Sequence, residues 1–152
     1  MRTKHLVLYA CLIVLMLAGG GYTQMPSRPY RNGSVWSIAF IHTHAGMGNA
    51  YLTYLTTDWK REQEALKQQG MILSYKVLTT EAHGANDWDV MLMTEYKDLA
   101  TMEANEAKAD ALTTSHLGGD QKIEQGYRDR SSMRDIVGER LAREIILQPR
   151  TP

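Results

Sequence analysis

The chain has 152 residues, with 17 lysines and arginines against 17 aspartates and glutamates, and a single cysteine. This length is typical of one domain, and the formal charge of zero argues against a basic nucleic-acid-binding protein. One cysteine excludes a disulfide framework and a cysteine-rich zinc module. A hydrophobic content of 43% is typical of a globular protein.

The first 23 residues have the three-part pattern of a secretory signal peptide. Arg2 and Lys4 precede an uncharged apolar run of 13 residues, Leu6 to Ala18, and glycines follow. This run is shorter than the roughly 20 residues that span a bilayer. We therefore predict a cleaved leader over residues 1–23 and an exported protein, periplasmic or secreted. An uncleaved membrane anchor and a lipid anchor on Cys11 are the alternatives.

Removal of the leader changes the composition of the chain. The only cysteine and two cations leave with it, so 15 cations remain against 17 acids and the charge becomes −2. Thiol catalysis and cysteine-ligated metal are then excluded from the exported protein. Residues 24–34 (QMPSRPYRNGS) hold two prolines and little apolar content, which predicts a linker ahead of a domain over 35–149.

The domain is predicted to begin with a strand, a helix and a second strand. Val35–Thr43 (VWSIAFIHT) is rich in β-branched and aromatic residues, which is typical of a buried strand. After a glycine-containing turn, apolar residues at helical spacing predict a helix over Asn49–Gln69. Asn49 is the expected N-cap and Gly70 the expected terminator. Met71–Glu81 is the second predicted strand.

A loop over 82–87 leads to a third predicted strand, Trp88–Tyr96 (WDVMLMTEY). We expect the second and third strands to pair antiparallel. Asp98 is placed to cap a second helix over 99–112, because its carboxylate can accept from the free backbone N–H groups of the first turn.

The last part of the domain is charged. Lys122–Ala142 has apolar residues at intervals that predict one or two short helices, and 143–148 is predicted to be a final strand that ends before Pro149. The order is β-α-β-β-α-β with an extra helical insertion before the last strand. This order predicts an α+β, ferredoxin-like domain with an antiparallel sheet.

Two segments resemble the dimeric α/β-barrel superfamily: VWSIAFIHTHAGMGNAYLTYLTTDWK and WDVMLMTEYKDLATM. The resemblance implies that two chains pair their sheets into one barrel. Members include metal-free monooxygenases acting on aromatic or polyketide substrates, haem-degrading and haem-containing enzymes, muconolactone-isomerase-like enzymes and stress-response proteins. The resemblance therefore does not identify a function.

The residue pattern gives a separate reason to expect a homodimer. Both faces of the first and third predicted strands are apolar. Helices cover only one face of such a sheet, and a large exposed apolar face needs another cover. A second copy of the chain would supply it with two-fold symmetry.

His42 and His44 form an H-x-H pair at the end of the first predicted strand, where both would point to one side. Such a pair could bind a metal or act as a base. No third ligand lies at a diagnostic spacing, so we predict no metal and no cofactor. In an enzyme, His42 would be the base, and Glu95 or Tyr75 would orient the substrate. The plainer alternative is that His42 is a polar side chain near a cavity mouth and that His44 is a turn residue.

Four aromatic residues could line an apolar pocket for an aromatic ligand: Trp36, Tyr75, Trp88 and Tyr96. Packing in the core or at the dimer interface is the alternative. Lys76 and Glu95 are charges within apolar strands. They either face solvent at a sheet edge or form ion pairs, or they line a polar ligand site. The predicted hairpin would place Lys76 opposite residues 87–89 and Glu95 near residues 72–74.

We therefore expect an exported homodimer that binds a small apolar or aromatic molecule, and whether it is an enzyme stays open. A cofactor-independent monooxygenase or isomerase of the same fold is one alternative. An envelope structural or interaction module, with Lys122–Ala142 as its contact surface, is the other. No nucleic-acid partner is expected, and contact with a membrane is expected only through an uncleaved leader.

Overall fold

The computed structural model describes residues 28–84 and 86–149. The chain divides into two units, and Tyr30–Gln148 is the one that contains the secondary structure described below. The predicted leader, residues 1–23, lies outside the described residues. Within the described ranges, none of the helices combines the length and the apolar character that crossing a bilayer requires.

Four strands and three helical runs make up this unit. In chain order they are β1 (Tyr30–Thr43), α2 (Gly48–Tyr54), the π-helical turn η1 (Leu55–Trp59), α3 (Lys60–Gln68), β2 (Ser74–Thr79), β3 (Val90–Tyr96), α4 (Leu99–Leu117), α5 (Asp120–Ser131) and β4 (Arg134–Leu147). The strands form one antiparallel sheet in the order β2-β3-β1-β4. The predicted α+β class is confirmed, and the arrangement is compatible with a ferredoxin-like fold.

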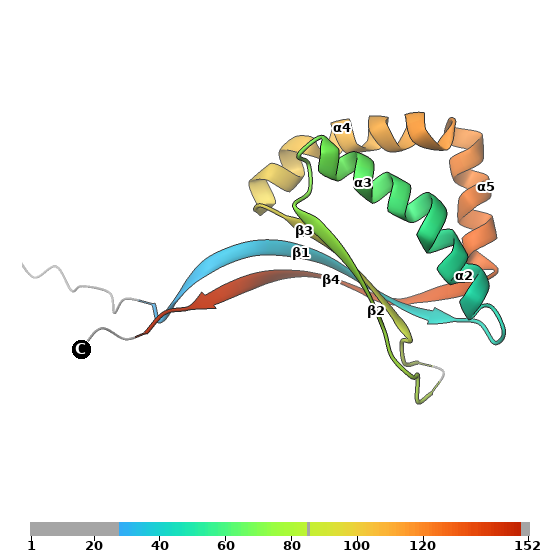
Figure 1. Ribbon diagram of the computed structural model, residues 1–152, viewed down its shortest axis with the longest axis horizontal. Helices are drawn as coiled ribbons and strands as arrows, with labels where there is room; N and C mark the ends of the chain where they lie inside the picture. Colours follow the sequence, from blue (N-terminus) through green and yellow to red (C-terminus); the bar gives the residue numbers. More distant parts are fainter. Residues whose placement is uncertain (1–27, 85, 150–152) are drawn as a thin grey trace, which may run out of the picture. The chain divides into compact units, whose positions relative to one another are not determined.

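The helices lie over one face of the sheet, which we call the helix side (Figure 1). Alternation along β1 turns Val35, Ala39 and Ile41 toward them. Ile41 pairs with Val90 of β3, and both pack against Tyr51 and Leu55 of the helix above. These four residues are at most 4% exposed and form the centre of the core.

The predicted helix over Asn49–Gln69 is present as the continuous run α2-η1-α3. Asn49 is not its N-cap: the helix begins at Gly48, after Met47, whose side chain makes no capping hydrogen bond. The turn is closed instead by the Met47 backbone N–H, which donates to the His44 carbonyl at 2.8 Å. Gly70 follows the helix end with a φ of +68°, a conformation that favours glycine, so the predicted terminator is confirmed.

Asp98 caps α4 as predicted. Its carboxylate accepts from the Thr101 backbone N–H at 2.7 Å, and this bond holds the pKa of Asp98 below its usual value. The helix runs to Leu117, five residues beyond the predicted end at Leu112. It stops where Gly118 and Gly119 both take positive φ. Threonines and serine before the glycines are weak helix formers, which is why the sequence indicated an earlier end.

Two strands, β1 and β4, begin earlier in the sequence than predicted. β1 begins at Tyr30 instead of Val35, so Tyr30–Ser34 of the predicted linker are strand residues. β4 begins at Arg134 instead of Arg143, and the extra helix before it ends at Ser131. The added parts of the two strands contribute to a pairing that runs from Tyr30–Leu147 to Thr43–Arg134. β4 is an edge strand, and charged residues in edge strands hide the period-two pattern.

Candidate functional site

The face of the sheet opposite the helices, which we call the open face, is apolar at its centre. The strand register places paired residues on the same face. Its apolar members are Trp36, Ile38 and Phe40 of β1, Met91 and Met93 of β3, and Leu78 of β2. No helix among the described residues lies over this face (Figure 1).

Aromatic side chains pack against one another on the open face. The rings of Phe40 and Trp88 lie edge to face, with centroids 5.5 Å apart. The Lys76 Nζ lies 5.0 Å from the centroid of the Trp36 ring, within the range of a cation–π contact. Three of the predicted ligand-binding residues, Trp36, Lys76 and Trp88, therefore belong to this surface.

The two predicted charges lie in neighbouring strands. Glu95 is opposite Ser74, as expected, and its Oε2 accepts from the Ser74 hydroxyl at 2.5 Å. Lys76 is opposite Met93, so the expected position opposite residues 87–89 is wrong. The hairpin closes on the Thr79–Val90 pair, which fixes that register.

Tyr75 lies on the helix side, away from the other predicted ligand-binding residues. Its ring packs edge to face on Trp59 at 5.3 Å, and its hydroxyl donates to Glu64 Oε1 at 2.5 Å. This bond to a carboxylate raises the pKa of Tyr75 to about 12. Alternation along β2 separates Tyr75 from Lys76, so the two cannot line one surface of the sheet.

His42 lies near the end of β1, where its Nδ1 is 2.9 Å from the carbonyl oxygen of Asp87. Glu95 is opposite Trp36, six residues earlier along β1. Six residues of strand span about 20 Å. The predicted catalytic pair, His42 and Glu95, is therefore not brought together within one chain.

His44 follows β1 in the turn. Its Nδ1 is 3.0 Å from the Ser132 carbonyl oxygen and its Nε2 is 3.0 Å from Asp135 Oδ2. The Ser132 carbonyl and then the Asp135 carboxylate raise the pKa of His44. Residues 28–84 and 86–149 contain no group of three or more His, Cys, Asp and Glu side chains placed to hold a metal ion.

We expect Asp135→Asn to lower the pKa of His44 but to leave it above the usual 6.5, because the Ser132 carbonyl, the larger cause, remains. Ring C–H shifts in an NMR pH titration would report this, with His44→Gln to assign the His44 signals. The raised pKa means that the pair stabilises the folded state most below about pH 6.5 and that this contribution is lost as the pH rises through the folded-state pKa. A His44 pKa unchanged by Asp135→Asn would contradict the assignment.

No protein-family model matches this chain, and no curated protein matches it. A solved structure does resemble it: the crystal structure of HapK from Hahella chejuensis. That similarity has a TM-score of 0.50 at 11% sequence identity, and it covers 78% of this chain and 99% of HapK. The likeness shows a shared fold.

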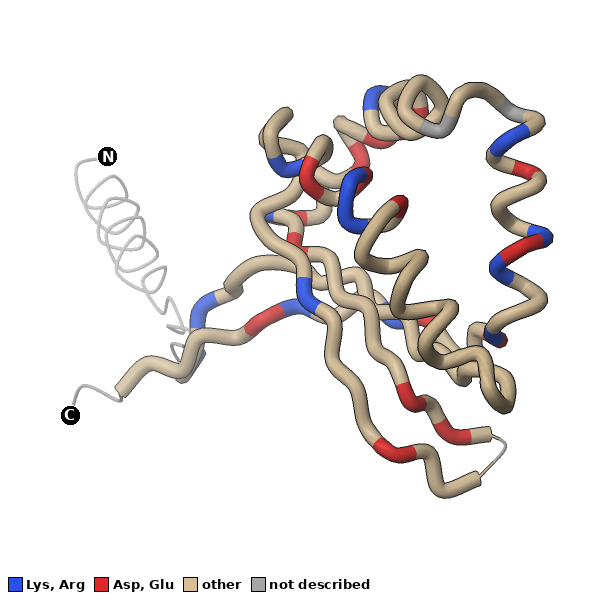
Figure 2. The backbone as a smooth tube through the Cα atoms, turned by 45° about the vertical axis from the view of Figure 1, so that its right-hand side comes forward, with Lys and Arg blue, Asp and Glu red and all other residues tan. Residues whose placement is uncertain are grey.

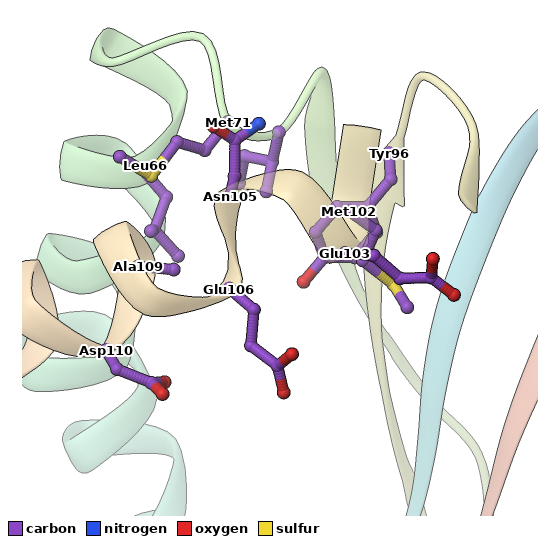
Figure 3. Close-up of a pocket in the computed structure, with 10 residues that line it drawn as sticks. Leu66, Met71, Tyr96, Met102, Glu103, Asn105, Glu106, Ala109 and Asp110 are labelled. Carbon is purple, nitrogen blue, oxygen red and sulfur yellow. The ribbon is translucent and has the colours of Figure 1, made fainter. Parts of the chain in front are cut away.

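A hollow of about 380 Å³ lies on the helix side between α3, the segment that leads into β2, the end of β3 and α4 (Figure 3). Its apolar lining includes Leu66, Met71 and Ala109, and the acidic residues Glu106 and Asp110 also line it. Of the predicted pocket-lining aromatic residues, Tyr96 lines this hollow, and Trp36, Tyr75 and Trp88 do not.

A second hollow of about 490 Å³ lies beside α5, and none of the predicted catalytic or ligand-binding residues lines it. Its charges have both signs, including the Arg61–Asp58 ion pair at 2.8 Å. Cationic and acidic residues also alternate along α5 itself (Figure 2). The predicted contact segment Lys122–Ala142 is therefore half a mixed-charge helix and half the edge strand β4.

The sequence places Trp36, Ile38 and Phe40 on one face of the first strand, but it did not connect that face with Arg140. Neither Phe40 nor Arg140 was predicted as a site residue, yet Arg140 lies opposite Ile38 and Phe40 packs on Trp88. The period-two pattern of β1 contained the signal for Phe40. Arg140 was hidden by the assignment of its segment to a helix.

Proposed function

We propose that this protein is an exported homodimer whose two open faces pack together and hold a small apolar or aromatic molecule between them. The observation that carries the proposal is the uncovered apolar face, with Trp36, Ile38 and Met93 at its centre. An exposed apolar patch of this kind usually marks an interaction or ligand site.

The face has the composition of a binding surface. Two tryptophans provide broad apolar area, and the unbranched methionines can adapt to the shape of a ligand. Trp36 and Trp88 are half-buried within one chain, so part of each ring is free to contact a ligand. The similarity to the HapK structure supports the fold on which this arrangement depends.

Ligand binding has more support than the enzyme alternative. A cofactor-independent reaction would need a positioned base next to the bound substrate. His42 and Glu95 lie about 20 Å apart along β1, and His42 contacts the Asp87 carbonyl instead of a carboxylate. Within one chain, this geometry does not assemble the predicted catalytic pair.

Sedimentation velocity of the purified protein tests the dimer, and titration with the fluorescent apolar probe N-phenylnaphthylamine tests binding. We expect Trp36→Ala to weaken probe binding about tenfold, because the open face loses an aromatic side chain that would contact the probe. The matched control is Tyr127→Ala, which removes a 62% exposed aromatic ring from α5. A monomeric protein that does not bind the probe would refute the proposal. Equal effects of Trp36→Ala and Tyr127→Ala would show that the probe does not bind at the open face.

A further inference from the structure

We infer that the molecule held on the open face carries an anionic group, and that the Lys76 ammonium is its partner. The inference rests on the proposed function, since it concerns the same surface. It assigns the ligand to a chemical class: an aromatic or apolar body joined to a carboxylate, sulfonate or similar anion.

One row across the open face carries the inference. The register places Lys76 of β2, Met93 of β3, Ile38 of β1 and Arg140 of β4 side by side. The row therefore has a cation at each end and apolar residues in the middle. The backbones of the two cationic residues are about 14 Å apart, which is three strand spacings. A ligand whose body lies on Met93 and Ile38 would have a cation within reach at either end.

Lys76 is the better partner of the two. Its ammonium lies over the Trp36 ring, and it takes part in none of the ion pairs formed by residues 28–84 and 86–149. Arg140, by contrast, donates from Nη1 to the Glu139 carbonyl at 2.7 Å. An exposed ammonium without a carboxylate is free to pair with an incoming anion, and charge-assisted hydrogen bonds are the strong ones.

Glu95, in the next row, is the nearest acidic member of the same face. Its Oε2 is already bonded to the Ser74 hydroxyl. It lies diagonally from Lys76 in the register, beside Met93 and opposite Trp36. The ligand's anionic group would therefore lie beside Lys76, in the row that does not contain the Glu95 carboxylate.

A lysine in an edge strand also discourages pairing with the strands of other chains. β2 is an edge strand, so this role alone would account for the charge. The two roles differ in one measurable respect, because only a ligand partner changes the preference between a charged and a neutral ligand.

Two probes that share a ring system make the test. Anilinonaphthalene sulfonate is anionic, and N-phenylnaphthylamine has the same rings without the sulfonate. Fluorescence titration of the full-length protein gives both dissociation constants. We expect the anionic probe to bind at least about tenfold more tightly. Lys76→Met should abolish this preference, measured as the ratio of the two dissociation constants, whereas Lys76→Arg should retain it.

Lys67→Met is the matched control, since it removes one exposed cation from the end of α3. Equal affinity for the two probes in the wild-type protein would overturn the inference and leave the proposed function standing. A preference that survives Lys76→Met would overturn the assignment to Lys76. Failure of both probes to bind would overturn the proposed function together with the inference.

Discussion

Leu55→Ala is expected to lower the free energy of unfolding by about 2–5 kcal/mol, a large part of the 5–15 kcal/mol typical of a domain. Leu55 is 4% exposed and packs with Ile41, Tyr51 and Val90 between the helix and the sheet. It also begins the π-helical turn η1. Truncation leaves a cavity at the centre of the core, and a rigid sheet on one side limits how far the surroundings can close it.

Urea unfolding followed by far-UV circular dichroism measures this loss as a lower midpoint with an unchanged slope. Leu52→Ala is the matched control: the same substitution one helical turn earlier, at a residue that is 38% exposed. We expect it to cost less than about 1 kcal/mol. Both variants are compared at one protein concentration, because the stability of the proposed dimer would depend on concentration. Equal losses at the two leucines would contradict the core described here.

The fold was predictable where local chemistry and pattern agreed. Asp98 is a strong N-cap, Gly70 supplies the left-handed conformation after a helix, and the alternation in β1 separates its two faces. The sequence was misleading for β4. In that edge strand, charges such as Arg140 and Glu144 are exposed whether the segment is helix or strand, so burial does not impose a period-two pattern.

The candidate site was predictable in composition and less so in arrangement. Trp36, Lys76 and Trp88 could be selected because they are aromatic or charged residues in or beside apolar strands. Their grouping depends on a register that a one- or two-residue error changes, as the position of Lys76 shows. Tyr75 was misplaced for a different reason: neighbouring strand residues point to opposite faces, so alternation along β2 separates it from Lys76 whatever the register. Its hydroxyl partner, Glu64, belongs to α3, the helix directly before β2.

Met91→Asp is expected to convert the proposed dimer into monomers. Met91 lies between Phe40 and Leu78 on the open face, so a carboxylate there would be buried by the second chain. An aspartate is too short to reach water along the sheet, unlike a lysine. Two-fold symmetry would also bring two such charges into one interface, where unpaired or like charges cost several kcal/mol. The dissociation constant of the dimer should rise at least about a hundredfold.

An aspartate introduced on the other face of the sheet distinguishes loss of the dimer interface from loss of the fold. Leu141→Asp adds the same charge to β4 at a residue that is 52% exposed and pairs with Ser37, away from the row of Ile38. Sedimentation velocity over a range of concentrations should find wild-type association for Leu141→Asp and monomers for Met91→Asp, with matching circular dichroism spectra. If Met91→Asp associates as tightly as the wild type, the open face is not the dimer interface. In that case the proposed arrangement, in which a ligand is held between two open faces, is overturned.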